Sequence, residues 1–302
     1  MASNALQQRL ARRFVKLLSG SSNGKPPWLS AVAEGDEGGF FLPGDAPWVV
    51  HRDFATLVGG VRALLLQALH PGALGGVAQH SRYEEDPLGR LSGTIRWLTV
   101  TTFGSMTAIK DEASRVNRMH DRVSGEYEKN SGQKTPYKAA DKDLLLWVHI
   151  AFMDSFLRTH QNYSTNPIPG GADAYVAQWS RSVGPLGLER APMSEQELVE
   201  ALNHYRPQLR VDESAKSVII WIRNAPLPRA AKPVYRLLFH SALATLPKDF
   251  REMIGIRSYP LWLLRPVTTF LLQLGRKAIG KDSPIEDAAI ARLKRVGLIA
   301  SS

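Results

Sequence analysis

The chain has 302 residues, no cysteine and a formal net charge of +10. The absence of cysteine excludes disulfides, zinc-thiolate sites, iron–sulfur clusters, thiolate-ligated haem and cysteine nucleophiles. Hydrophobic residues make up 44% and charged residues 22%, as in ordinary globular proteins. Basic residues are spread along the chain, and no zinc-finger, basic-zipper or RNA-binding aromatic signature occurs, so we do not expect a nucleic-acid partner.

The first 20 residues predict an amphipathic helix with basic side chains around an apolar stripe. The stripe consists of Leu6, Leu10, Phe14, Leu17 and Leu18. Arginine and lysine interrupt the apolar positions, so the segment lacks the apolar core of a secretory signal, and we expect a cytoplasmic protein. Such a helix can lie on an anionic membrane, pack on its own domain or mediate a subunit contact, so peripheral membrane contact stays open.

Three regions are expected: the N-terminal helix of residues 1–20, a Gly/Pro-rich loop of residues 21–47, and one domain of residues 48–302. The loop contains Trp28, Phe40 and Phe41, which indicate that it lies across the core. Strand signals are weak throughout, because no alternating apolar run is bounded by Asn-Gly or Asp-Gly turns. We therefore predict an all-α, single-domain helical bundle.

The first helix of this domain is predicted over about residues 49–69, ending before Pro71, which cannot continue it. One face of the helix is thin and consists of Gly59, Gly60, Ala63 and Gln67. Each interior glycine costs roughly 1 kcal/mol relative to alanine, so something is expected to approach this face closely. Contact with another helix is the first interpretation, and a planar macrocycle is the second.

Two helices follow over about residues 90–104 and 107–127, separated by Gly104-Ser105, and residues 130–136 predict a polar loop. Further amphipathic helices are predicted at residues 172–183, 195–204, 214–222, 230–244 and 284–296. The apolar stretch of residues 261–274 would span roughly 21 Å as a helix, less than a bilayer core of roughly 30 Å. It therefore predicts a buried or an interfacial helix.

The longest helical pattern with a titratable group at its apolar centre is DLLLWVHIAFMDSFL, residues 143–157. The helical period places His149 on one stripe with Leu145, Leu146, Phe152, Met153 and Phe156, and places Asp143, Asp154 and Arg158 on the other side. A buried imidazole needs partners, since an unpaired polar group costs roughly 1–3 kcal/mol. Two interpretations stay open: a core histidine bonded to a carbonyl of another helix, or a metal ligand.

Several common catalytic motifs are absent from the sequence. It contains no Gly-x-Gly-x-x-Gly motif, phosphate-binding loop, Glu-x-x-His pair or His-Glu-x-x-His motif, and no Gly-x-Ser-x-Gly elbow between a predicted strand and a helix. What remains is isolated histidines on apolar helical faces. Haem iron needs only one protein ligand and a large dry pocket between helices, which such a sequence can provide.

Four sequence blocks resemble a known family: LLLQALHPGALGGVAQHS, DPLGRLSGTIR, RMHDRVSG and DLLLWVHIAFMDS. Between about Trp48 and Leu246 the chain is similar to a bacterial family long described as a domain of unknown function. That family includes the rubber-cleaving latex-clearing oxygenases and the fungal oxygenase that cuts the terpenoid side chain of a mycophenolic acid precursor. The resemblance implies an all-α, globin-related catalytic domain around a b-type haem (haem b), with His149 as the iron ligand.

The resemblance also implies a distal site on the preceding helix, where the rubber oxygenases have an Arg, Lys and Thr cluster. Here the segment reads RVNRMH: Arg115 matches the Arg, Arg118 stands near the Lys, Met119 replaces the Thr, and His120 is additional. We therefore expect distal chemistry that differs from rubber cleavage, with His120 and Arg115 or Arg118 acting on dioxygen or peroxide. The alternative is that these arginines are solvated and His120 is a core contact.

The two haem propionates would pair with Arg82, Arg90 or Arg96, since arginine binds carboxylates bidentately. An apolar, isoprenoid or lipid-like substrate would suit the pocket, so we expect a haem-dependent oxygenase or oxidase. Two other functions stay open. One is a non-catalytic helical module that binds lipid or haem at a membrane surface, and the other is a haem sensor or carrier.

Overall fold

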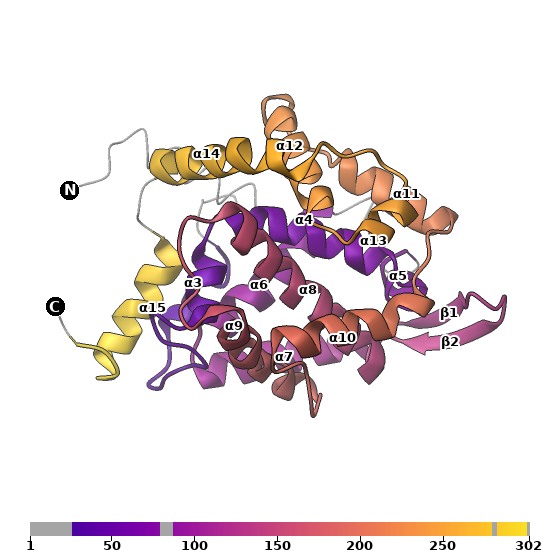
Figure 1. Cartoon of the computed structure of the whole chain (residues 1–302). Coiled ribbons are helices and arrows are strands. Elements are labelled where there is room, and N and C mark those ends of the chain that lie inside the picture. Colours follow the sequence, from indigo (N-terminus) through magenta and orange to yellow (C-terminus); the bar gives the residue numbers. More distant parts are fainter. Residues whose placement is uncertain (1–25, 79–86, 280–282, 301–302) are drawn as a thin grey trace.

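The computed structural model describes residues 26–78, 87–279 and 283–300. Apart from one short hairpin these residues are helices and their connections, which confirms the predicted all-α class (Figure 1). The α-helices are α2 (Leu29–Ala33), α3 (Ala46–Arg52), α4 (Ala55–Ala68), α5 (Pro71–Ala78), α6 (Pro87–Phe103), α7 (Met106–His120), α8 (Lys142–Tyr163), α9 (Gly171–Trp179), α10 (Glu195–Tyr205), α11 (Glu213–Arg223), α12 (Lys232–Ala244), α13 (Lys248–Ile254), α14 (Leu261–Ile279) and α15 (Pro284–Arg295). The strands are β1 (Ser124–Glu128) and β2 (Lys134–Lys138), and the 3₁₀ segments are η1 (Ser180–Leu186), η2 (Arg206–Gln208) and η3 (Arg229–Ala231).

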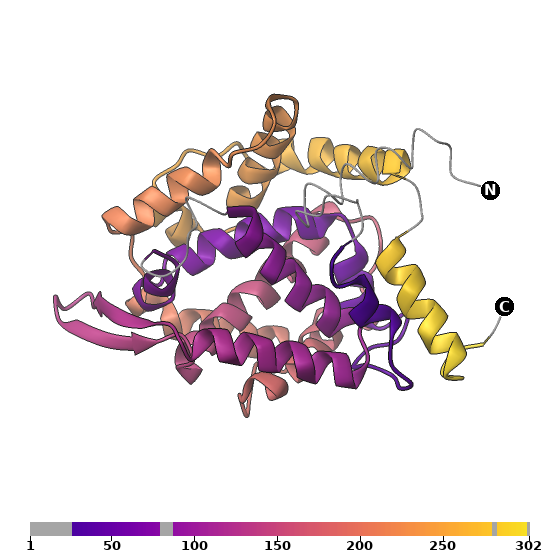
Figure 2. The same cartoon turned by 180° about the vertical axis from the view of Figure 1, so that it is seen from behind.

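Helices α4 and α8 form the centre of the molecule and pack along one another. Helices α11 and α12 pack on α4, and α14 packs on both α12 and α8. In Figures 1 and 2, helices α11, α12 and α14 form an upper layer, and the β1–β2 hairpin projects from one end of the molecule, with α15 near the other end. One continuous apolar core joins α3, α4, α8, α9 and the upper layer.

Gly59 allows α4 and α8 to approach each other closely. A Cβ atom added at this position would lie 2.6 Å from Phe156 Cδ1 and 2.9 Å from Thr159 Oγ1, both on α8. A larger residue would therefore push against the packed aromatic ring. The predicted close helix contact is confirmed at Gly59, whereas an added Cβ at Gly60 would have no neighbour within 4 Å among the described residues.

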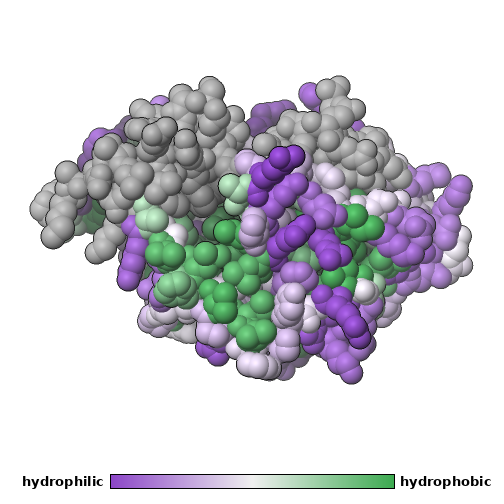
Figure 3. Space-filling view, turned by 90° about the horizontal axis from the view of Figure 1, so that it is seen from above, coloured by the Kyte–Doolittle hydropathy of each residue, from purple (hydrophilic) through white to green (hydrophobic). Residues whose placement is uncertain are grey.

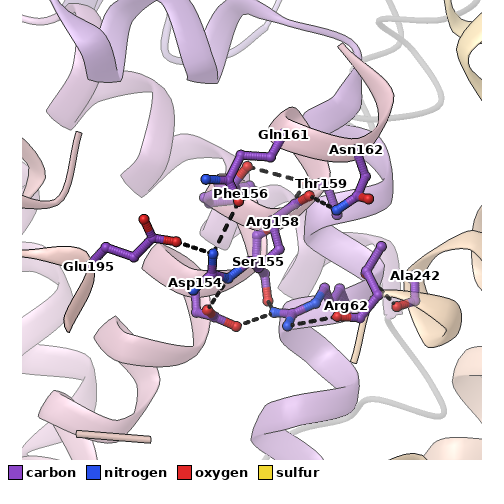
Figure 4. Close-up of polar contacts among 11 residues, drawn as sticks. Arg62, Asp154, Ser155, Phe156, Arg158, Thr159, Gln161, Asn162, Glu195 and Ala242 are labelled. Carbon is purple, nitrogen blue, oxygen red and sulfur yellow. Dashed lines mark hydrogen bonds and ion pairs between the residues drawn. The ribbon is translucent and has the colours of Figure 1, made fainter. Parts of the chain in front are cut away.

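A chain of ion pairs also fastens α4 to α8 (Figure 4). Arg62 Nη1 lies 2.7 Å from Asp154 Oδ2, and both side chains are buried. Asp154 Oδ1 accepts a hydrogen bond from Arg158 Nε at 3.1 Å, and Arg158 also pairs with Glu195 at the start of α10. The helical period places Asp154 on the side of α8 away from the His149 stripe. That side is enclosed too, and the buried carboxylate is compensated by cations.

The single helix predicted over residues 49–69 is also wrong, because α3 and α4 are separate helices. Between them, Asp53 Oδ1 accepts the Ala55 N–H at 2.8 Å. This bond satisfies a backbone donor that the first turn of a helix leaves unpaired, so α4 can begin there. Helix α4 then ends at Ala68, and Pro71 is the first residue of α5.

The predicted helix end at residue 127 is wrong, and the predicted loop of residues 130–136 is too long, because residues 134–136 belong to a strand. Helix α7 ends at His120, and strands β1 and β2 pair antiparallel, with Gly125 opposite Tyr137. The turn contains Gly132 at a φ of +81°, a conformation that residues with a Cβ rarely adopt. The strands are short and polar and no Asn-Gly turn joins them, so the usual sequence signals of a hairpin are missing.

The helices predicted in the second half of the chain are confirmed as α9, α10, α11, α12 and α15, with ends shifted by a few residues. The expected loop of residues 21–47 contains the short α2, and its Trp28 and Phe41 are buried, as predicted for a segment across the core. The predicted N-terminal helix of residues 1–20 lies outside the described residues. Among those described, we find no helix with the length and hydrophobicity needed to cross a membrane.

Candidate functional site

His149 lies on α8 with 8% of its surface exposed. Burial lowers the pKa of its imidazole from 6.5 to about 3, so the ring is neutral near neutral pH. Its Nε2 atom is buried and has no hydrogen-bond partner among the described residues. The ring lies nearly parallel to the Trp179 indole, with an interplanar angle of 12° and centroids 6.4 Å apart. A structural histidine would donate to or accept from a group of another helix at Nε2, and among the described residues His149 has no such partner there.

His149 borders a cavity of about 440 Å³ that lies mainly between α6, α7 and α8. This volume falls within the range of roughly 300–1,000 Å³ that is typical of cofactor and small-molecule pockets. Most of its wall is apolar or aromatic, and the larger lining side chains include Trp97, Leu98, Val116, Val148, Phe152 and Trp179. A molecule in this cavity would be surrounded mainly by apolar side chains.

Several buried nitrogen atoms of the cavity residues lack partners. Besides His149 Nε2, the Gln67 Nε2 and Trp179 Nε1 atoms are buried without a hydrogen-bond partner within residues 26–78, 87–279 and 283–300. Buried polar groups in native proteins are nearly always paired, and those that are not call for an explanation such as a ligand or water. A group bound in the cavity could pair with these three atoms.

Glu112 holds two arginines beside this cavity. The residue is 2% exposed, and its carboxylate lies 2.6 Å from Arg115 Nη2 and 2.7 Å from Arg96 Nε. Arg115 lines the cavity, so the pairing fixes a positive charge at the wall. His120, farther along α7, lines the cavity as well.

The structure brings together three of the predicted site residues, since His149, Arg115 and His120 all line the cavity. Arg118 is exposed and does not line it. Arg96 is directed to Glu112 and is also absent from the cavity wall. Arg82 and the side chain of Arg90 lie outside the described residues.

Sequence reasoning missed Glu112, Trp97 and Trp179 as parts of the site. The spacing of Glu112 and Arg115 by three residues on one helix is a signal for an ion pair, but the pairing with Arg96 joins two helices. Trp179 is thirty positions from His149, and only the packing of α9 against α8 brings the two rings together. No local pattern indicates such a contact.

The other buried histidines of the core have partners that His149 lacks. His70 Nδ1 accepts the N–H groups of Gly72 and Ala73 at 3.2 and 3.3 Å and so caps the start of α5. His160 Nε2 lies 2.8 Å from the carbonyl oxygen of Asn166. The described residues contain no group of three His, Asp or Glu side chains that could hold a bare metal ion. A metal at His149 would therefore require a cofactor that supplies the remaining ligands.

These features describe a helical protein in which a buried imidazole with an unpartnered nitrogen borders an apolar cavity of cofactor size. A sequence model of the family described as ER-bound oxygenase mpaB/B'/Rubber oxygenase, catalytic domain, matches residues 48–276. The chain belongs to this family, as its four sequence blocks predicted, and the match includes the whole of α4 to α13. Searches among curated proteins and solved structures gave no match, and the expected relation to globins stays a prediction.

Proposed function

We propose that the protein is a haem b-dependent oxygenase that acts on an apolar, isoprenoid or lipid-like molecule. The observation that carries this proposal is the buried, unpartnered Nε2 of His149 beside an apolar cavity. Membership in a family of oxygenase catalytic domains supports the reaction class. The cofactor and the substrate class are inferred from the chemistry of the site.

The donor set at the cavity suits a haem. One imidazole is sufficient as a protein ligand, because the porphyrin supplies the equatorial nitrogens. The low pKa of His149 keeps its imidazole unprotonated, as iron ligation requires. When bound, haem supplies a redox-active iron for reaction with dioxygen or peroxide. The unpartnered Nε2 would thereby gain the partner that the chain does not provide.

Arg115 and His120 on α7 would act on the oxygen co-substrate. Glu112 engages Nε and Nη2 of Arg115, so the guanidinium is oriented while its remaining N–H donors can bind an oxygen atom. His120 would give or accept a proton at an imidazole nitrogen. Arg118 is exposed and has no role in this proposal unless the helix moves.

The apolar wall would bind the substrate and exclude water from the reacting atoms. Burying apolar surface contributes roughly 25 cal/mol per Å², so a long hydrocarbon chain gains affinity without polar contacts. Arg82 and Arg90 stay predicted partners of the haem propionates. Arg96 already pairs with Glu112, and it would have to leave or share that carboxylate.

Replacing His149 by glycine tests the iron ligand. The wild-type protein is expected to bind haem and show a Soret band, and the His149→Gly variant is expected to lose it. Added imidazole should restore the band, because it can take the place of the missing side chain. His51→Gln is the matched control, since His51 is equally buried but has partners for both ring nitrogens. A glycine variant with full haem and an unchanged spectrum would refute the proposal.

Dioxygen uptake in the presence of an isoprenoid chain such as squalene then separates an oxygenase from a haem carrier. Uptake that depends on both haem and the hydrocarbon is expected. A haem-loaded protein that consumes no dioxygen with any apolar substrate would support a carrier or sensor instead.

A further inference from the structure

Helix α14 presents an apolar stripe to the outside of the molecule. Leu263, Val267, Phe270 and Leu274 recur at i, i+4, i+7 and i+11, and each is between 43 and 66% exposed. Trp262 beside them is 76% exposed. We call these five residues the α14 face. It repeats with helical spacing, so it is a continuous surface and not a set of isolated exposed residues.

The α14 face points outward because the opposite side of the helix is packed on the upper layer. Leu264, Thr268 and Leu272 are buried, and Thr268 Oγ1 lies 2.7 Å from Ser241 Oγ on α12. The helix is thus fixed to the upper layer by one side, and its apolar residues on the other side cannot turn inward. Viewed from above in Figure 3, hydrophobic side chains gather over the α14 side of this layer with hydrophilic side chains at their border.

The exposed charges of α14 and of the segment that precedes it are all positive. No acidic residue occurs between Glu252 and Asp282, whereas Arg257, Arg265 and Lys277 in this stretch are exposed. Helix α12, which packs on α14, adds the exposed Lys232 and Arg236. An apolar surface bordered by cations matches the boundary between the acyl chains and the headgroups of an anionic bilayer.

Charge complementarity favours an anionic bilayer over two other possible occupants of the α14 face, a second copy of the chain and the N-terminal segment. A second copy placed on the same face by a two-fold axis would bring like charges together. The N-terminal segment of residues 1–20 contains four basic and no acidic residues, so it would be repelled as well. An anionic membrane, in contrast, attracts the cations beside the α14 face and those of residues 1–20 alike.

We propose that the α14 face docks the protein on an anionic membrane surface. The five apolar side chains would enter the headgroup boundary, where tryptophan is favoured, and the flanking cations would bind lipid phosphates and carboxylates. This is peripheral docking by a helix that lies in the membrane plane. No residue of α14 lines the His149 cavity, so docking is independent of the proposed haem function.

Vesicle flotation of the full chain tests the proposal. The protein is expected to float with phosphatidylcholine vesicles that contain phosphatidylserine and to stay behind with phosphatidylcholine alone. Phe270→Glu should lower the partition coefficient about tenfold or more, because an apolar anchor becomes an anion. Arg265→Gln should lower it about fivefold and weaken its dependence on salt.

Val199→Glu is the matched control, because Val199 is 40% exposed but lies on α10, away from the upper layer. An unchanged circular dichroism spectrum must show that each variant is folded. An unchanged haem spectrum would show that membrane docking by the α14 face and haem binding at His149 are separate properties. Wild-type protein that does not float would overturn the docking. So would flotation that survives Phe270→Glu but is lost in Leu10→Glu/Phe14→Glu, which would assign the anchor to the N-terminal segment. A dimer that Phe270→Glu dissociates, without vesicle binding, would overturn it in favour of a second copy.

Discussion

Two buried histidines, His51 and His149, lie beside the same indole, and they differ in how they meet it and in their hydrogen bonds. His51 meets Trp179 edge-on with centroids 4.4 Å apart, and His149 lies parallel to it at 6.4 Å. Both are less than 9% exposed, and burial lowers both pKa values to about 3. The nitrogens of His51 are both hydrogen-bonded, whereas Nε2 of His149 has no partner in the described part of the chain.

The hydrogen bonds of His51 also fix its tautomer. Thr102 Oγ1 donates to the Leu98 carbonyl oxygen at 2.7 Å, so it accepts from Nδ1–H of His51 at 2.8 Å. Nε2 of His51 then accepts the hydroxyl proton of Tyr175 at 3.0 Å. No lone pair is left for a ligand. Burial and a low pKa are therefore shared by a structural and a candidate ligand histidine, and only the missing partner separates them.

The comparison implies that removing the partner of a buried polar group lowers the stability of the fold. The loss should be largest when the group left behind is charged. Asp154→Ala leaves the Arg62 guanidinium buried without its carboxylate. We expect a loss of about 3–5 kcal/mol in the free energy of unfolding, because an unpaired buried charge is strongly unfavourable. Urea denaturation of the apo protein measures this loss.

The double variant Arg62→Met/Asp154→Leu is the control for that prediction. Replacing both charges by apolar side chains of similar size removes the pair without leaving an orphan, so most of the stability should return. If the single variant were as stable as the wild type, the ion pair would be exchanging with water and the argument from missing partners would fail.

Local signals explain which parts of the fold were predictable. The burial of His149 follows from the spacing of apolar residues within one helix. The start of α10 follows from Ser194, whose Oγ accepts the N–H of Glu197 at 3.1 Å as the sequence spacing suggests. Each of these features is decided by residues within two turns of one another, so periodicity and capping rules suffice.

Features that depend on distant residues were not predictable. The hairpin forms because β1 and β2 pair with each other and β1 packs on α5, although their residues have little strand character. Asp154 is buried because Arg62, ninety-two positions earlier, lies opposite it. The cavity itself is a property of packing: periodicity marks which side chains turn inward but not where three helices leave space.

The pH dependence of stability tests the burial that the two histidines share, because a buried neutral imidazole resists protonation. Between pH 6.5 and about 3 the unfolded chain protonates His51 while the folded chain does not. The unfolded state therefore binds more protons, and stability falls as the pH falls through this window, by up to about 1.4 kcal/mol per pH unit for this residue. The apo His51→Gln variant should lack that contribution.

Urea denaturation of both proteins from about pH 7 down to about pH 5 measures the difference in slope. The other histidines titrate equally in the two proteins, so their contributions cancel in the comparison. Parallel curves would mean that His51 is protonated in the folded state or solvated, and the network with Thr102 and Tyr175 would not hold.

The smallest expected effect is also the one that bears most directly on His149. Replacing a histidine that has a structural partner destabilises a protein, but replacing one whose Nε2 is already unpaired removes a polar group that gained nothing from folding. We therefore expect apo His149→Leu to be as stable as the wild type or more stable by about 1 kcal/mol. Added haem should raise the melting temperature of the wild type through binding to the folded state, and it should leave the leucine variant unchanged. A leucine variant that is clearly less stable without haem would show that the imidazole is held by the fold, and the bound group inferred for the cavity would lose its anchor.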